Sequence, residues 1–282
     1  MNFLVTGIHG FVGQEVKAAF EGAGHSVRSV PRDILMTGGE PLQQIVSGAD
    51  AIVNLAGASI MGRWTRKKKH EIMESRRIST RNLVTAVNGL EKKPGLFINA
   101  SAVGIYQPDT SCDEDSQVYS GYFLGQVVKA WEEELKGLTD VRKVVLRFGL
   151  VVGKNGGLLK RLLPLIKARI AVVIGEGLQD FPLIHVGDIA GFILWSASRE
   201  KVAGIYNLVI PEEPIYREFV VALGQICKPW LTVVIPEWCL KLAMGESAEV
   251  LTKAAHVVPR RLAESGYLLK YGTVDEVIRG CL

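Results

Sequence analysis

The first thirteen residues restrict the fold of this chain more than any other stretch. An apolar run over 3–5 leads directly into a glycine-rich loop and then into a helical pattern, which predicts a strand, a phosphate-binding loop and a helix. Glycine lets the chain turn tightly, lets a pyrophosphate approach the backbone and lets the helix pack closely on the sheet. The candidate nucleotide-binding residues of this loop are Gly7, Ile8, His9, Gly10, Phe11, Val12 and Gly13.

A second strand follows this helix and ends where a dinucleotide-binding unit selects its nucleotide. Glycines at 22–24 end the helix, and the strand is expected over 26–30. Selectivity for NAD needs an acid at the end of this strand, but the chain has Pro31 and Arg32 there. A guanidinium suits the 2′-phosphate of NADP, so NADP is the favoured cofactor. A solvated pair between Arg32 and Asp33 is the alternative.

Strand and helix patterns alternate through the first half of the chain. Strands are expected over 51–55, 96–100 and 144–150, and helices over 71–87 and 127–135. This alternation is typical of an α/β fold with a Rossmann-like, doubly wound parallel sheet.

The alternation fades after Gly153, where prolines and glycines become frequent. We expect residues 1–153 to form an NADP-binding Rossmann domain, to which some later segments can return. Residues 154–282 are expected to form a smaller α/β lobe, with a helical C-terminal segment over 236–282 that caps the lobe or meets a partner.

Composition argues against several classes of protein. The 282 residues are 48% hydrophobic and 22% charged, with a formal charge of +4, which suits one large domain or two unequal ones. The basic run at 66–69 is short and has no interleaved aromatic residues, so nucleic acid is not an expected partner. Four cysteines without C-x-x-C spacing argue against a metal site and a disulfide framework. We find no leader and no apolar stretch of about eighteen residues, so the cytoplasm is the expected location and a membrane is not an expected partner.

Ligands of such sheets bind beyond the carboxyl ends of the strands. After the third strand we expect the backbone of Leu55, Ala56, Gly57 and Ala58 to pass close to the adenosine and the pyrophosphate, because Gly57 leaves room for a close approach. The next strand ends at Ser101, a candidate for both cofactor and substrate contact.

The chain resembles the extended short-chain dehydrogenase/reductase family. The resemblance covers the whole length and rests on T-G-x-x-G-F-x-G at 6–13, N-L-A-G at 54–57 and the strand end at Ser101. More narrowly, the chain is similar to the atypical, NAD-dependent epimerase/dehydratase-like subfamily that is sometimes labelled cell-division inhibitor and has a C-terminal domain of unknown function. The stretches that carry this similarity are 75–80, 101–104, 131–132, 175–179, 184–188, 206–208, 245–246 and 257–262.

The resemblance implies hydride transfer assisted by three side chains. A serine or threonine orients the substrate, a tyrosine acts as general acid and base, and a lysine four residues later lowers the pKa of the tyrosine. Ser101 matches the serine and would polarise a substrate carbonyl. A serine bonded to local backbone is the alternative.

The dyad of tyrosine and lysine is absent or altered in this chain. Alignment on Glu132 places Leu124 at the tyrosine position and Val128 at the lysine position, and neither can transfer a proton. Use of Tyr122 instead puts Gln126 where the lysine belongs.

Tyr122 and Tyr106 nevertheless join Ser101 as candidate catalytic residues, with a buried structural role as the alternative for Tyr106. On the helix after the third strand, the S-R-x-x-x-T pattern at 75–80 resembles that of the subfamily. It makes Arg76 a candidate partner of the pyrophosphate or ribose, with Glu71 five residues before it. An ion pair at the surface is the alternative.

The resemblance makes the second half a substrate-binding lobe. An amphipathic helix over 158–167 would line it. Asp188 is expected to cap a helix that begins at Ile189, or to have a packing role, rather than to contact substrate. His185 is likewise expected to have a structural role. Basic side chains that would suit an anionic substrate are Arg147, Lys160, Arg161 and Lys167.

Two functions remain open at this stage. In the first, the protein is an NADP(H)-dependent reductase or epimerase-like enzyme acting on a carbonyl or sugar-type substrate. In the second, it binds NADP(H) without turnover as a redox sensor or regulator. Extended family members often dimerise through helices next to the active-site helix, so a homodimer is also left open.

Overall fold

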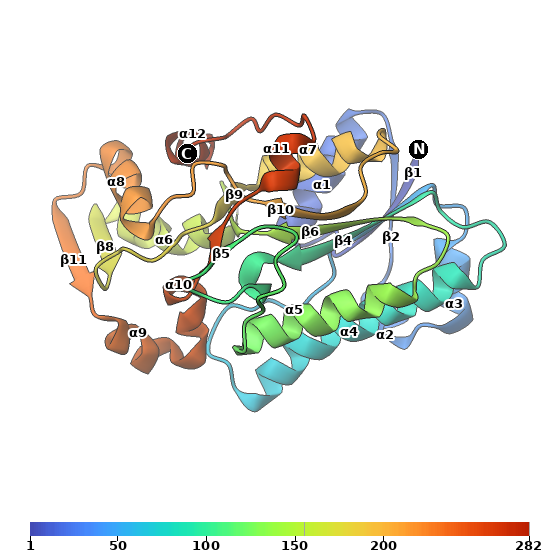
Figure 1. Cartoon of the computed structure of the whole chain (residues 1–282), viewed down its shortest axis with the longest axis horizontal. Helices are drawn as coiled ribbons and strands as arrows, with labels where there is room; N and C mark the ends of the chain where they lie inside the picture. Colours follow the sequence, from blue (N-terminus) through green and yellow to red (C-terminus); the bar gives the residue numbers. More distant parts are fainter. Residues whose placement is uncertain (155, 282) are drawn as a thin grey trace.

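A six-stranded parallel sheet forms the centre of the molecule (Figure 1), which confirms the predicted Rossmann-like α/β fold. The computed structural model describes residues 1–154 and 156–281, without the side chains of Arg161 and Leu163. The strand order is β10-β6-β4-β3-β1-β2. The strands are β1 (Asn2–Thr6), β2 (Ser26–Ser29), β3 (Ala51–Asn54), β4 (Leu96–Ala102), β6 (Arg142–Phe148) and β10 (Gly204–Leu208).

Helices cover both faces of this sheet (Figure 1). One face carries α1 (Phe11–Gly22) against α7 (Val186–Ala197), and the other carries α4 (Arg66–Asn88) beside α5 (Phe123–Glu133). The short helices α2 (Arg32–Thr37) and α3 (Gly39–Val46) pack against α4.

Side chains of β1 alternate between the two faces, as the pleat of a strand requires. Phe3 and Val5 belong to the apolar core under α1 and α7, whereas Leu4 belongs to the core that α3 and α4 cover. The unbroken apolar run at 3–5 is therefore the mark of a strand buried on both faces.

Two glycines allow the turn from β1 to α1. Gly7 has a φ of +68°, and a Cβ there would lie 2.6 Å from the carbonyl oxygen of Leu55. A Cβ on Gly13 would lie 2.2 Å from the carbonyl oxygen of Gly7, so α1 could not pack as closely on the loop with any other residue. The turn of the candidate phosphate-binding loop is thus formed by close backbone approach.

The second half of the chain adds small parallel sheets and helices beside the central sheet. The paired strands are β7 (Leu150–Gly153) with β9 (Leu183–His185), β8 (Ile170–Ile174) with β11 (Leu231–Ile235), and β5 (Ser111–Cys112) with β12 (His256–Val257). The helices are α6 (Gly157–Lys167), α8 (Tyr216–Cys227), α9 (Glu237–Met244), α10 (Glu249–Thr252), α11 (Arg260–Glu264) and α12 (Val274–Cys281).

Two segments of the second half return to the first. β10 completes the central sheet beside β6, and β12 pairs with β5. The segment over 236–282 is largely helical in its described part, with β12 as the exception. Within the described ranges, no helix has the length and the apolar character needed to cross a membrane.

Candidate functional site

A row of buried polar side chains crosses the sheet near the carboxyl ends of β1, β3 and β4. The Thr6 hydroxyl donates to Asn54 Oδ1 at 2.7 Å, and Asn54 Nδ2 donates to Asn99 Oδ1 at 2.7 Å and to Thr80 Oγ1 at 2.9 Å. Thr80 on α4 also accepts from the Trp131 indole of α5 at 2.9 Å. Because every member has a partner, the row fixes the strand ends that carry the candidate ligand loops.

The loop after β3 is tied to this row. The backbone N–H groups of Leu55 and Ala56 both lie 3.2 Å from the Thr6 hydroxyl oxygen, and the N–H of Ala58 donates to Ser75 Oγ at 2.9 Å. The loops after β1 and β3 therefore lie side by side, as expected for a shared nucleotide site.

Helix α1 begins at this point with properties that suit an anion. Its N-cap is Gly10, which places no side chain over the N-terminal N–H groups, and its first turn contains no acidic residue. Phe11 lies under the turn that follows β7, where a Cβ on Gly156 would come within 2.3 Å of its ring. The Gln14 side chain donates to the carbonyl of His9 at 3.2 Å and holds the loop.

Arg32 begins α2 just beyond the end of β2, and its side chain is 77% exposed. Its guanidinium lies 3.7 Å from the carboxylate of Glu71 on α4, while Pro31 precedes it as the N-cap. The ion pair with Asp33 that the sequence offered as an alternative is not formed. An exposed pair at this distance holds Arg32 weakly, so its guanidinium can turn to another anion.

Arg76 of α4 lies beside the loop after β3. Its Nη1 donates to the carbonyl oxygens of Ala58 at 3.0 Å and Ile72 at 3.1 Å, and its guanidinium lies over the Trp131 ring at 5.1 Å. A Cβ on Gly57 would meet the guanidinium carbon at 2.9 Å. Burial lowers the pKa of Arg76 to about 10.

The surface ion pair considered for Arg76 is therefore absent. No carboxylate of the described residues lies within ion-pair distance of its guanidinium. A desolvated cation without a counter-ion, next to a glycine and a helix N-terminus, favours an anionic ligand.

Ser101 belongs to a second buried network. Ser101 and Arg147 are register partners in β4 and β6, and Glu132 of α5 reaches both. The Ser101 hydroxyl donates to Glu132 Oε1 at 2.5 Å, and Arg147 donates to the two oxygens of the same carboxylate at 2.9 and 2.7 Å. Because its hydrogen is given to Glu132, the hydroxyl of Ser101 offers only its lone pairs to any further group.

Tyr106 completes this network from the other side. It is 2% exposed, accepts from Arg147 Nη1 at 2.8 Å and donates to Asn207 Oδ1 at 2.8 Å. Burial raises the pKa of Tyr106 to about 12, so the phenol stays protonated at neutral pH. This geometry matches the structural role that the sequence offered as the alternative.

Tyr122 is placed differently. It immediately precedes α5 and is 39% exposed. Leu124, in the first turn of α5, is partly buried, and Val128 is 3% exposed in an apolar cluster with Ile105 and Tyr106. None of the seven tyrosines in the sequence is followed four residues later by lysine.

Of the two structural roles expected for Asp188, the capping of α7 is not formed. The helix begins at Val186, and the cap is His185, whose Nδ1 accepts from the N–H of Gly187 at 3.1 Å. The Asp188 carboxylate instead accepts the backbone N–H groups of Lys270 at 2.7 Å and Tyr271 at 3.1 Å. Asp188 therefore holds the C-terminal segment against α7.

Glu132, Asn207 and Glu114 were not among the predicted site residues, and Glu132 served only to align the dyad. Glu114 is 4% exposed and accepts the N–H of Asn207 at 2.9 Å. The signals in the sequence were two of the resemblant stretches, 131–132 for Glu132 and 206–208 for Asn207, and none marked Glu114. Among the basic residues considered for an anionic substrate, Arg147 is committed to Glu132, and the side chain of Arg161 lies outside the described residues.

Comparison with known proteins gives matches over the whole chain. Residues 3–208 match the NAD dependent epimerase/dehydratase family, and residues 235–280 match a domain of unknown function, DUF1731. The chloroplastic epimerase family protein SDR39U1 homolog of Arabidopsis thaliana is 30% identical, over 100% of this chain and 87% of that protein. Epimerase family protein YfhF of Bacillus subtilis is 31% identical, over 98% and 96%. The crystal structure of human epimerase family protein SDR39U1 (isoform 2) with NADPH is 28% identical, with a TM-score of 0.92 over 100% of this chain and 99% of that one.

Proposed function

The chain belongs to the NAD dependent epimerase/dehydratase family, and on that premise we propose that it is an NADP(H)-binding protein of the reductase or epimerase type. The observation that carries the proposal is Arg76, a desolvated cation without a carboxylate partner among the described residues, beside the glycine loop. The similar human protein was solved with NADPH, which supports the same cofactor.

The described residues fit a dinucleotide at the carboxyl ends of β1, β2 and β3. The backbone of Gly10 to Gly13 at the start of α1 would hold the pyrophosphate, with Arg76 beside it. Arg32 would leave Glu71 and contact the 2′-phosphate. The cofactor, when bound, supplies the hydride chemistry.

In a reductase, the proton would come from a group that the buried hydrogen-bond networks leave accessible. Ser101 and Tyr106 give their hydrogens to Glu132 and Asn207, whereas Tyr122 is exposed at the start of α5. On this proposal Tyr122 is the proton donor for a carbonyl or sugar-type substrate. No lysine follows Tyr122 four residues later, so Tyr122 lacks the activating group of the family and turnover would be low.

The same geometry favours a second candidate. A protein that binds NADP(H) without turnover, as a redox sensor or regulator, needs the dinucleotide loops but no proton donor. The inward hydrogen bonds of Ser101 and Tyr106 are the specific observation in its favour.

Titration of the purified protein with NADPH and NADH, followed by addition of carbonyl compounds to the NADPH complex, tests both candidates. We expect NADPH to bind more tightly than NADH, and Arg76→Met to weaken NADPH at least tenfold, with exposed Lys17→Ala as the matched control. Oxidation of NADPH that is lost in Tyr122→Phe identifies the enzyme. Binding without oxidation by any compound supports the sensor, and no binding of either nucleotide rejects the proposal.

A further inference from the structure

Exposed apolar side chains are concentrated at one end of the molecule. Of the fourteen large apolar residues exposed in the described part of the chain, eight lie between 221 and 242. They belong to α8, β11, α9 and the turn before β11, which lie together at one end (Figure 1). We call this surface the apolar end; its residues are Val221, Ile226, Trp230, Leu231, Val233, Val234, Trp238 and Leu242.

The centre of the apolar end is a strand with a free edge. β11 pairs only with β8, in a sheet of two strands, and no other described strand lies along its outer edge. Leu231 to Val234 are exposed on both faces of the strand, and Val234 reaches 61%. A sheet of two strands is marginal in water, and an uncharged edge of this kind is a template for another strand.

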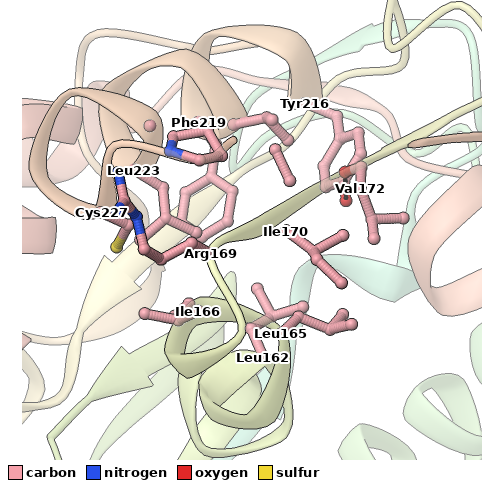
Figure 2. Close-up of a pocket in the computed structure, with 14 residues that line it drawn as sticks. Leu162, Leu165, Ile166, Arg169, Ile170, Val172, Tyr216, Phe219, Leu223 and Cys227 are labelled. Carbon is pink, nitrogen blue, oxygen red and sulfur yellow. Dashed lines mark hydrogen bonds between the residues drawn. The ribbon is translucent and has the colours of Figure 1, made fainter. Parts of the chain in front are cut away.

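An apolar recess continues this surface. Between α6, β8 and α8 the structure has a small recess of about 30 Å³, lined by Leu162, Ile166, Phe219 and Leu223 (Figure 2). Pro229, at its border, precedes Trp230 of the apolar end. The Trp230 indole N–H donates to the carbonyl of Ala168 at 3.0 Å, which fixes the ring while 71% of the residue stays exposed.

We propose that the apolar end is the interface of a homodimer, in which β11 pairs antiparallel with β11 of a second copy around a twofold axis. This arrangement converts two two-stranded sheets into one sheet of four strands and leaves no free β11 edge. If the twofold axis passes at Val233, Leu231 lies opposite Ile235 of the partner copy. A second copy is the one occupant whose edge must match this edge in length and register, because it is the same strand.

Charge at the two ends of β11 fits the same arrangement. Lys228 precedes the strand and Glu237 follows it; both are exposed, and neither has an ion-pair partner among the described residues. Antiparallel pairing about Val233 brings each Lys228 within one position of the facing Glu237. Parallel pairing would instead set like charges together.

The apolar content is sufficient for a stable dimer. A standard interface buries about 800 Å² per partner, and one buried tryptophan supplies roughly 150–250 Å². Trp230 and Trp238 are 71% and 67% exposed, and six further apolar residues surround them. By contrast, none of the exposed large apolar side chains in the described chain lies on α4 or α5.

Sedimentation velocity over a range of concentrations tests the interface. We expect a dimer for the full chain, and we expect Val234→Lys and Trp238→Glu each to raise the dimer Kd at least about 30-fold, as loss of an interface hot spot does. Leu268→Lys is the matched control, since Leu268 is 88% exposed and outside the apolar end. Circular dichroism and NADPH binding show that each variant is folded.

The charge pair tests the register. Lys228→Glu and Glu237→Lys should each weaken the dimer, and the double variant should restore it. A chain that stays monomeric at all concentrations overturns the proposal, as does a dimer that all four variants leave intact. Sedimentation of the monomer with vesicles of phosphatidylcholine and phosphatidylserine would overturn it in favour of a membrane surface.

Discussion

Arg147 illustrates how the candidate site is held at the residue scale. It is 1% exposed and uses three donors on two partners, the Glu132 carboxylate and the Tyr106 hydroxyl. The bidentate pair fixes the spacing between α5 and β6, and Ser101 is bonded to the same carboxylate. In this chain the serine that the family resemblance assigned to chemistry is part of a structural network.

Removal of one partner from this pair should be costly. Arg147→Met leaves the Glu132 carboxylate without its counter-ion, and we expect a loss of about 3–5 kcal/mol in the free energy of unfolding. The double variant Arg147→Met/Glu132→Leu should recover most of the loss, because no buried charge remains. Urea denaturation measures both variants, and a double variant as unstable as the single one would contradict this account.

Arg32 tests nucleotide selectivity. If its guanidinium contacts the 2′-phosphate, Arg32→Ala should weaken NADPH by roughly 10- to 100-fold, the value of a charge-assisted hydrogen bond, and leave NADH nearly unchanged. Fluorescence titration with both nucleotides gives the ratio. Equal losses for NADPH and NADH would remove Arg32 from this role.

At the scale of elements, the start of α7 links stability to pH. Burial lowers the pKa of His185 from its ordinary value of 6.5, and its Nδ1 must remain unprotonated to cap the helix. A depressed pKa in the folded state means that the stabilisation is complete above about pH 6.5 and is lost as pH falls toward the depressed value.

The variant His185→Asn isolates this effect. Asparagine keeps an acceptor at the N-cap but does not titrate in this range. We therefore expect the melting temperature of the wild type to fall more steeply than that of His185→Asn as pH drops below about 6.5. Parallel pH profiles by differential scanning calorimetry would argue against a titrating cap.

The elements that the sequence predicted correctly have a strong local pattern. The glycine loop could be predicted because its close backbone contacts leave no room for a Cβ at Gly7 and Gly13. The turn therefore requires glycine at these positions, and their spacing is visible in the sequence. β5 and β12 were missed because strands of two residues have no periodicity and form only when residues 111–112 meet 256–257. The start of α7 was placed three residues late because histidine is an uncommon cap.

The same limit applies to the candidate site. Loop residues could be predicted, since the glycines mark them in the sequence. The bond between Ser101 and Glu132 joins residues 31 positions apart on a strand and a helix, and no local pattern reports it. Whether a serine at a strand end faces a ligand or a neighbouring helix depends on packing between elements that are distant in the sequence.

At the scale of the whole molecule, the C-terminal segment is part of the main core. Leu262, Val277 and Ile278 belong to the same apolar cluster as Phe3 and Val16. Asp188 and Glu114 each bind backbone N–H groups of this segment, at 270–271 and at 261. The two predicted regions therefore share one core at these contacts.

A truncated chain ending at Ile235 should consequently fail to fold cooperatively. It would lose β12, α11 and α12, expose the apolar cluster and leave Asp188 buried without donors. Limited proteolysis and near-UV circular dichroism would report rapid cleavage and loss of fixed tertiary structure. A sharp unfolding transition like that of the full chain would contradict this expectation.

The shared core of the two chain ends also affects how the protein is made. During synthesis, Phe3 leaves the ribosome long before Ile278, its partner in the same cluster. The sheet itself lacks an edge strand until 204–208 has emerged. The nascent chain must therefore keep its first strands from aggregating until translation ends, which makes it a candidate client of ribosome-associated chaperones.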